Sequence, residues 1–298
     1  MIDGSGFIVQ GTGSREGIDL SYRKNITCRN VEIRGFFIGI HLQNSSYIDI
    51  VENNIVDNRD GVYLGHSSSV SIIGNYIASN DRYGINLYES RNNIMSENVI
   101  TTNEHSGIYH FYSGPKPTIS NNSIAANVIT ANQYHDIGIY YSSHNSIQRN
   151  TIADNGLRVL FSSSSNHIVY SNSFIDNKDQ VHLHESFNNS WISPAASGNY
   201  WSNYNPPDED KDRIGDLPYI IDENNLDQYP LIYPYGFVPS PDVNGDDIIT
   251  IKDLFQVSRA FGSKPGDVRW NPYADIENDG LINIIDLYQV ARNFGKTV

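Results

Sequence analysis

The chain has 298 residues, of which 34 are acidic and 20 are basic, giving a formal net charge of −14. This acidity argues against a nucleic-acid partner, because phosphate binding requires clustered lysine and arginine. The single cysteine excludes an intramolecular disulfide, and no apolar run approaches the roughly 20 residues that span a membrane.

The first residues, MIDGSGFIVQGTGS, start inside a repeating pattern and do not form a signal peptide. We therefore expect that the natural N-terminus, with any export signal, lies outside this sequence. Cys28 follows in an alternating apolar run, which predicts a buried, unreactive thiol.

A repeated Asn-x-Ile/Phe-x-x-Asn unit dominates residues 1–199. Its first asparagine stands at positions 53, 75, 98, 127, 150 and 172, so the spacings are 22, 23, 29, 23 and 22 residues. Each period holds three short β-type runs. In the period that begins at Asn53, the first run contains Ile55, the second is Gly-Val62-Tyr-Leu64 and the third is Val70-Ser-Ile72. Equivalent inward residues of the third run are expected at Ile94, Ile119, Ile147 and Ile168. A period of this length indicates stacked coils, and we predict a mainly β protein, a right-handed parallel β-helix rising ~4.8 Å per coil.

Two roles explain why asparagine recurs at fixed places. Asparagine tolerates the left-handed backbone conformation that sharp bends need. Its amide can also hydrogen-bond to the equivalent amide of the next coil. The 29-residue period contains YSGPKPTISNNS, where Pro115 and Pro117 cannot donate ladder hydrogen bonds, so we expect a loop displaced outward.

Alternation along the second run predicts which side chains face solvent. Five aromatic residues fall on outward positions and form a predicted patch on one face: Tyr63, Tyr88, Tyr109, Phe111 and Tyr140. Such a patch can stack on sugar rings. The alternative is that tyrosine is simply favoured in strands and packs on its neighbours.

Evidence for catalysis is weaker. A β-helix hydrolase needs carboxylates on adjacent coils of one face, but the outward rows offer only Asp19. A lyase or epimerase needs a base and a charge-neutralising group. The candidates are Glu104, His105, His135 and Asp136, just before the second run of two consecutive coils. A polar loop without catalytic function is the alternative.

Residues 200–236 change character and are predicted to cap the last coil. Tyr and Trp residues there, including Trp201, are expected to cover the end of the apolar stack. Within PPDEDKDRIGD, the near-alternate carboxylates of Asp208, Asp210 and Asp212 resemble a calcium loop. A solvated acidic turn is the alternative.

These features resemble the NosD-like, carbohydrate-binding/sugar-hydrolase (CASH) type of β-helix within the pectin-lyase-like group. The resemblance covers roughly residues 7–236, including the closing phrase GNYWSNYNPPDEDKDRIGDLPYIIDENNLDQYPLIYPYG, similar to the end of many archaeal extracellular members. It implies a secreted or cell-surface location. It leaves activity open, because the group includes hydrolases, lyases, epimerases, copper-site maturation proteins and non-enzymes. Copper would favour clustered Met, Cys or His, and His182 and His184 are the close pair available.

After a linker at 237–241, residues 242–298 carry a duplicated motif. Residues 242–262 and 275–295 share 11 of 21 identities, and each copy reads as a loop followed by a short helix. Both loops follow the spacing of the EF-hand, with oxygen ligands at positions 1, 3, 5, 7, 9 and 12. The predicted ligands are Asp242, Asn244, Asp246, Ile248, Thr250 and Asp253 in the first loop, and Asp275, Glu277, Asp279, Leu281, Asn283 and Asp286 in the second.

This duplicated loop-helix resembles a type I dockerin. The resemblance implies two calcium ions and a cohesin domain as partner, with loop positions 10 and 11 contributing to specificity. Those positions hold Ile251, Lys252, Ile284 and Ile285. Two departures are expected to weaken calcium binding: Asp247 replaces glycine at position 6 of the first loop, and Glu277 replaces a shorter side chain at position 3 of the second.

The leading hypothesis is a non-catalytic module that binds polysaccharide and is tethered to a cohesin through a calcium-dependent dockerin. The alternatives are a polysaccharide lyase, epimerase or hydrolase, a structural cell-surface protein, and a copper-site accessory protein.

Overall fold

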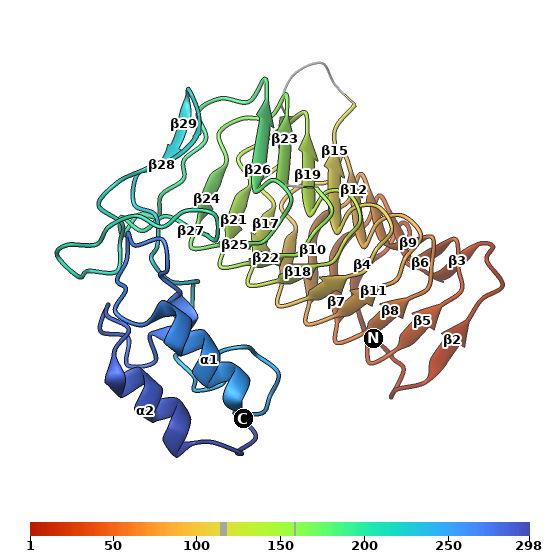
Figure 1. Cartoon of the computed structure of the whole chain (residues 1–298). Helices are drawn as coiled ribbons and strands as arrows, with labels where there is room; N and C mark the ends of the chain where they lie inside the picture. The colour runs from red at the N-terminus through yellow and green to blue at the C-terminus, as the bar shows by residue number, and fades with distance from the viewer. Residues whose placement is uncertain (114–117, 158) are drawn as a thin grey trace.

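The computed structural model describes residues 1–113, 118–157 and 159–298. It is a long parallel β-helix, followed by an irregular segment and a small helical unit at the opposite end from the N-terminus (Figure 1). Pro115 and Pro117, on which the predicted outward loop depends, lie outside the described residues.

Three long sheets, with all strands parallel, form the β-helix in the described residues. The first sheet contains β1 (Ile2–Asp3), β4 (Lys24–Arg29), β7 (Ser46–Val51), β10 (Ser68–Ile73), β13 (Ile94–Ser96), β17 (Ser123–Ala125), β21 (Ser146–Gln148) and β24 (Ile168–Tyr170). The second contains β2 (Ile8–Gln10), β5 (Glu32–Arg34), β8 (Asn54–Val56), β11 (Tyr76–Ala78), β14 (Val99–Thr101), β18 (Val128–Thr130), β22 (Thr151–Ala153), β25 (Ser173–Ile175) and β27 (Tyr200–Trp201). The third contains β3 (Glu16–Asp19), β6 (Ile38–Gln43), β9 (Asp60–Gly65), β12 (Ile85–Tyr88), β15 (Ile108–Phe111), β19 (Ile137–Tyr140), β23 (Val159–Ser162) and β26 (Val181–His184).

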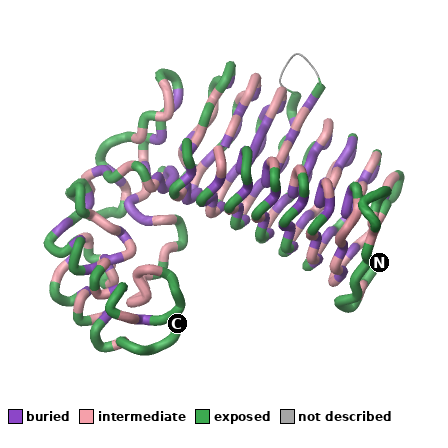
Figure 2. Tube along the Cα trace, turned by 45° about the vertical axis from the view of Figure 1, so that its right-hand side comes forward, coloured by how far each residue is buried: buried purple, intermediate pink, exposed green. Residues whose placement is uncertain are grey.

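One continuous apolar core runs along the inside of these coils, which Figure 2 shows as buried segments recurring in each turn. In the second sheet, Ile55, Ile77 and Ile100 lie directly over one another and are each 0% exposed. Cys28 is also buried, in register with Ile50. The stacked inward side chains replace the two-layer core of an ordinary globular domain.

Two details of the predicted register are wrong. In the first sheet, Ile94 and Ile168 are 45% and 46% exposed, and the neighbouring Met95 and Val169 fill the core instead. Ile119 belongs to a separate pair of short strands, β16 (Thr118–Ile119) and β20 (Ser142–Ser143). These corrections shift residues between faces without changing the repeat.

A third correction concerns Tyr140. The pattern of the second run puts Tyr140 in one row with Tyr63 and Tyr109, but the structure pairs Tyr140 with Phe111 and pairs Gly138 with Tyr109. Tyr140 still faces outward on the third sheet, because a shift of two residues preserves the face of a strand.

The asparagines form hydrogen-bonded columns along the axis. In the column from Asn53 to Asn199, each side-chain oxygen after that of Asn53 accepts from both the backbone N–H and the amide of the preceding asparagine. A second column runs from Asn58 to Asn177 at the next bend. The predicted amide stacking is therefore confirmed.

The predicted conformational role of these asparagines is wrong. The left-handed backbone falls on the residue before each one, for example Glu52 (φ 54°) before Asn53 and Glu97 (φ 58°) before Asn98. In these two columns the asparagines are therefore selected for their side-chain hydrogen bonds. At other bends, Asn44, Asn92 and Asn121 do adopt the predicted left-handed conformation.

Other bends carry further columns. Ser45, Ser67 and Ser90 hydrogen-bond in succession at the bend between the third and first sheets. A further column contains Asn93, Asn122 and Asn145 and continues to His167, whose Nδ1 accepts from the backbone N–H of Asn145 at 3.2 Å. A neutral imidazole thus takes the place of an amide, and burial lowers the pKa of His167 to about 3.

The cap covers the last coil as predicted from its aromatic residues. Trp201 stacks on Phe174 with ring centroids 4.4 Å apart, and Tyr219 stacks on the other face of Trp201 at 4.2 Å. Strands β28 (Tyr219–Asp222) and β29 (Asn225–Asp227) form an antiparallel hairpin. The fully buried Asp227 accepts from the backbone N–H of Asn199 and from the Trp201 indole.

The C-terminal unit has two helices, α1 (Ile251–Ala260) and α2 (Ile284–Arg292), with the 3₁₀ turn η1 (Pro272–Ala274) between them. Its small core includes Val257 and Val290, one from each helix. Each copy of the duplicated motif is hydrogen-bonded to the other. After the first helix, the backbone N–H of Gly262 donates to the Ile282 carbonyl of the second loop, and after the second helix, the N–H of Gly295 donates to the Ile249 carbonyl of the first loop. No helix in the described part of the chain combines the length and apolarity needed to cross a membrane.

Candidate functional site

The predicted aromatic patch lies on the outer face of the third sheet. Tyr88, Tyr109, Phe111 and Tyr140 form one cluster, with ring centroids 6.1 Å apart for Tyr88–Phe111, 6.4 Å for Tyr109–Phe111 and 5.2 Å for Tyr109–Tyr140. All four are half-buried, so each ring keeps an exposed portion. Partial burial raises the pKa of Tyr109 to about 12.

Tyr63 faces the same way but lies at the margin of this cluster. Its ring is 5.4 Å from that of His41 on the preceding coil, while on the next coil the buried Asn86 separates Tyr63 from Tyr109 in the same row. The five predicted residues therefore share a face, and four of them form a continuous surface.

Three aromatic rings that the alternation rule did not select extend this cluster. Tyr83 stacks on Tyr109 with a centroid distance of 4.6 Å and an interplanar angle of 12°. His105 contacts Tyr83 at 5.0 Å and Tyr134 at 4.5 Å. These residues precede the strands, where inward-outward alternation does not apply. We call Tyr83, Tyr88, Tyr109, Phe111 and Tyr140 the aromatic face.

A charged pair borders the aromatic face. The guanidinium of Arg82 lies 4.5 Å from the centroid of the Tyr83 ring, and its Nε is 3.3 Å from a carboxylate oxygen of the buried Asp60. Burial raises the pKa of Asp60, and the neighbouring Arg82 opposes that shift. This pair holds a polar group with fixed orientation beside the rings.

The four catalytic candidates do not converge on an open site. Asp136 is 0% exposed and His135 is 4% exposed, whereas Glu104 is exposed and His105 is half-buried against Ser106. Burial raises the pKa of Asp136 well above its usual value. His135 and Asp136 are therefore buried in this structure, and Glu104 and His105 are the two candidates with exposed surface.

The soft metal ligands of the chain are dispersed. Cys28 and Met95 are buried in the core on separate coils, while His182 and His184 are exposed on β26. Across the described residues, the groups of three potential ligands that converge contain aspartates alone. This donor set does not fit a copper site, because copper proteins draw on histidine, cysteine and methionine.

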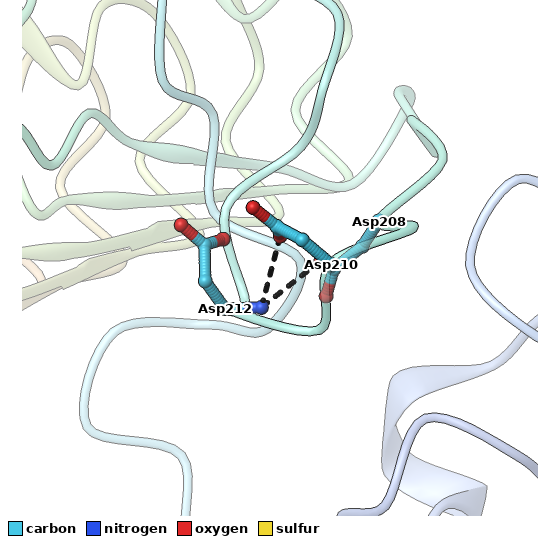
Figure 3. Close-up of side chains that lie close together, drawn as sticks. All are labelled: Asp208, Asp210 and Asp212. Atoms are coloured by element: carbon cyan, nitrogen blue, oxygen red, sulfur yellow. Dashed lines mark hydrogen bonds between the residues drawn. The ribbon is translucent and has the colours of Figure 1, made fainter.

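The acidic loop of the cap brings three carboxylates together. Asp208, Asp210 and Asp212 each place one oxygen within 4.8 Å of the others (Figure 3). The backbone N–H of Asp212 donates to Asp208 and Asp210, which folds the loop into a tight turn. Desolvation raises the pKa of Asp208. Carboxylate oxygens are the hard ligands that calcium prefers.

In the first calcium loop of the C-terminal unit, Asp242, Asp246 and Asp253 also place one oxygen each within 4.8 Å of one another. Asp253 is 0% exposed. This donor set fits calcium, which would be held by these carboxylates. Asp247 at position 6 has φ +63°, the left-handed conformation that glycine adopts most readily. Lys252 forms an ion pair with Asp246 at 2.9 Å and thus competes with a cation at that ligand.

The second calcium loop is arranged differently. Asp275 and Asp286 are both 0% exposed. One carboxylate oxygen of Glu277 accepts a hydrogen bond from Gln289 of α2 at 2.8 Å, so the long side chain at position 3 also contacts the helix. At position 9, Asn283 caps α2 by accepting from the Ile285 N–H at 2.7 Å, as Thr250 caps α1 in the first repeat.

The four residues at loop positions 10 and 11 are accessible. Ile251 and Ile284 begin the two helices and are 64% and 67% exposed, and Ile285 is 42% exposed. The Lys252 side chain is 71% exposed. Exposed isoleucines at equivalent places in the two repeats are typical of a protein-binding surface.

Comparison with known proteins places these features in two families. Residues 2–206 match the family model described as periplasmic copper-binding protein (NosD), and residues 240–295 match the dockerin type I domain. The first match covers most of the chain, and the second coincides with the duplicated loop-helix motif.

Individual relatives match parts of the chain. A protein of Pseudomonas aeruginosa named probable ABC transporter binding protein NosD is 36% identical over 94 residues, which are 31% of this chain and 22% of that protein. Its namesake in Stutzerimonas stutzeri is 28% identical over 172 residues, covering 57% of this chain and 36% of that protein. The chain thus spans well under two thirds of these relatives. Among solved structures, the periplasmic alginate epimerase AlgG aligns at 20% identity with a TM-score of 0.49, over 59% of this chain and 47% of that one.

Proposed function

The chain belongs to the NosD family and carries a type I dockerin domain, and we propose that it is a non-catalytic module outside the cytoplasm that binds polysaccharide and is tethered to a cohesin. The family match is to periplasmic proteins, and dockerins bind cohesins, which supports the location and the tether.

The observation that carries the proposed binding is the continuity of the aromatic face. Its rings come from three successive coils, β12, β15 and β19, and so extend about 10 Å along the axis at ~4.8 Å per coil. Half-buried rings held by their neighbours lose little conformational freedom when a sugar ring stacks on them. The polar Asp60–Arg82 pair beside Tyr83 supplies hydrogen-bonding groups for hydroxyls.

The tether depends on calcium. We assign one ion to each dockerin loop and a third to the acidic loop of the cap, because each provides several carboxylate oxygens in one short turn. The dockerin core contains six fully or nearly fully buried apolar residues, so calcium is expected to contribute much of its folding free energy.

Titration of immobilised or soluble polysaccharides with the full chain tests the binding. Tyr109→Ala removes the ring that contacts Tyr83, Phe111 and Tyr140, and should weaken binding about tenfold, or 1.4 kcal/mol. Tyr76→Ala is the matched control, since Tyr76 is 47% exposed on the second sheet. Equal affinity of both variants and the parent chain for every polysaccharide tested would contradict the proposal.

The same samples distinguish binding from catalysis. A non-catalytic module leaves the chain length and epimer composition of the polysaccharide unchanged after prolonged incubation. Unsaturated products absorbing in the ultraviolet, or an altered epimer ratio, would show an enzyme and overturn this part of the proposal.

Capture by a panel of cohesin domains in calcium and in chelator tests the tether. Ile284→Asp places a charge on the exposed start of α2 and should abolish capture. Val268→Asp is the control, because Val268 is fully exposed outside both helices. Capture that survives chelation, or that both variants lose equally, would contradict this role.

A further inference from the structure

The two calcium loops of the dockerin have the same spacing but different surroundings. In the first loop, Asp242 at position 1 accepts hydrogen bonds from the backbone of Gly245, Asp246 and Asp247. Positions 4 to 7 of that loop, residues 245–248, are exposed. The first loop is therefore closed by its own backbone and faces solvent.

The second loop is covered by the cap. The hydroxyl of Tyr233 donates to the carboxylate of Asp275 at 2.6 Å, although the two residues are 42 positions apart. Tyr233 is 8% exposed and Asp275 is 0% exposed. The carboxylate of Asp275 also accepts from the backbone of Asp279 and Gly280, as the equivalent aspartate does in the first loop. Tyr233 is thus an additional donor that the first loop lacks among the described residues.

Further contacts hold the same loop against the cap. The Lys211 ammonium donates to the backbone oxygen of Asp279 at 3.3 Å. In the amide orientation assigned from its hydrogen bonds, Asn278 accepts from the guanidinium of Arg213 at 3.0 Å and donates to the Tyr233 hydroxyl at 3.3 Å. The cap therefore contacts positions 1, 4 and 5 of the second loop.

The ring of Tyr233 is fixed from both domains. It lies parallel to Phe237 with centroids 5.8 Å apart and meets the Trp270 ring of the dockerin edge-on at 6.1 Å. Phe237 in turn contacts Tyr273 of η1 at 5.4 Å. This packing sets the position from which the hydroxyl reaches Asp275.

We propose that Tyr233 is an outer-sphere residue of the second calcium site, so that calcium binding in this loop and docking of the dockerin against the cap are coupled. Hydrogen bonds to a ligating carboxylate fix its orientation, and their loss typically costs 10- to 100-fold in metal affinity. Coupling is reciprocal, so calcium in the second loop strengthens the cap–dockerin contact by the same factor. This inference rests on the calcium assignment in the proposed function, but it needs neither the polysaccharide nor the cohesin.

Calcium titration calorimetry of the full chain tests the coupling. Tyr233→Phe keeps the stacked ring and removes the donor, and should weaken one binding event at least tenfold while leaving the others unchanged. Tyr235→Phe is the matched control, since Tyr235 lies two residues away and is 40% exposed. A Tyr233→Phe isotherm identical to that of the parent chain would overturn the proposal.

Two loop variants identify the affected event. Asp275→Asn should remove the event that Tyr233→Phe weakens, and the double variant should bind calcium like Asp275→Asn alone, because the ligating carboxylate on which Tyr233 acts is already lost. Asp242→Asn should remove a different event and leave the effect of Tyr233→Phe intact. The loss of calcium affinity caused by Tyr233→Phe could instead disappear in the Asp242→Asn background, or persist undiminished in the Asp275→Asn background. Either result would show that Tyr233 does not act on the second loop.

Protease accessibility gives a readout of docking. Calcium should protect the 237–241 segment between cap and dockerin in the parent chain, and protection should require about tenfold more calcium in Tyr233→Phe. Cleavage that does not depend on calcium in the parent chain would refute the reciprocal coupling.

Discussion

Replacement of Asn127 by alanine tests the hydrogen-bonded columns most directly. Asn127 is 1% exposed. Its side-chain oxygen accepts from the backbone N–H of Asn98 at 3.0 Å and from the amide of Asn98 at 2.9 Å. Its amide nitrogen donates to the backbone oxygen of Met95 and to the side-chain oxygen of Asn150, both at 2.9 Å. Alanine removes all four hydrogen bonds.

The expected cost follows from which partners are left unpaired. The Asn150 oxygen still accepts from the Asn127 backbone, and the Asn98 amide still donates to Ile72. The Asn98 N–H loses the partner described above, whereas the Met95 carbonyl remains within the parallel ladder of β13 and β17. One buried unpaired group costs about 1–3 kcal/mol, so we expect Asn127→Ala to lower the free energy of unfolding by about 2 kcal/mol, the middle of that range.

Urea unfolding followed by far-ultraviolet circular dichroism measures this change, after equilibration from both the folded and the unfolded side. Asn224→Ala is the control, because Asn224 is exposed in the cap hairpin, and it should change the unfolding free energy by less than about 0.5 kcal/mol. A loss below about 1 kcal/mol for Asn127→Ala would refute the argument, since water or relaxation would then be satisfying the freed groups.

Three further predictions concern buried ionisable groups and calcium. Burial lowers the pKa of His167 from 6.5 to about 3, so the contribution of His167 to stability is complete above pH 6.5 and is lost as the pH falls towards 3. His167→Asn should therefore reduce the loss of stability between pH 8 and pH 5, measured by urea unfolding at both values. An unchanged pH dependence of the unfolding free energy would contradict this prediction. Burial raises the pKa of Asp136 well above 3.8, so the stabilising contribution of Asp136 is present below pH 3.8 and is lost as the pH rises through the raised pKa. Asp136→Asn should therefore be more stable than the parent chain at pH 8, and the difference in unfolding free energy should shrink towards pH 4. A difference that does not change with pH would argue against burial as the cause. Chelation of calcium should lower the melting temperature of the dockerin, seen in Trp270 fluorescence, and leave the β-helix transition unchanged; a dockerin transition unaffected by chelator would count against calcium-dependent folding.

The repeat could be predicted from sequence because one physical requirement recurs in every coil. A buried side chain must lie over its equivalent, so inward residues and bend asparagines repeat together. The predicted register of Tyr140 was wrong because a glycine occurs two residues away from its usual place in that coil. Glycine precedes the inward residue at Gly84 and Gly107, where an added Cβ would approach a backbone oxygen of the next coil to 2.7 and 2.8 Å. The next coil has Asp136 at this place and Gly138 two residues later, which shifted the prediction for Tyr140 by two residues.

The candidate sites differ in how far sequence can define them. The predicted dockerin ligands of each loop lie within twelve consecutive residues, so spacing alone is enough to propose them. The place of Tyr83 in the aromatic face was not predicted, because Tyr83 lies in a bend, where the inward-outward alternation of a strand does not indicate which way a side chain points. Tyr233 could not be assigned to a calcium loop 42 residues away, since that contact depends on how two domains pack.

The amide columns also make the two ends of the β-helix chemically different. Backbone groups of parallel strands point alternately up and down the axis, so their dipoles largely cancel. In the columns, by contrast, every side-chain oxygen faces the preceding coil. The last coil is consequently left with donors from Asn199, and the carboxylate of Asp227 receives both its backbone N–H and its amide. Two such solenoids could extend one another only head to tail, and any segment that replaced this cap would have to present an acceptor at the same point.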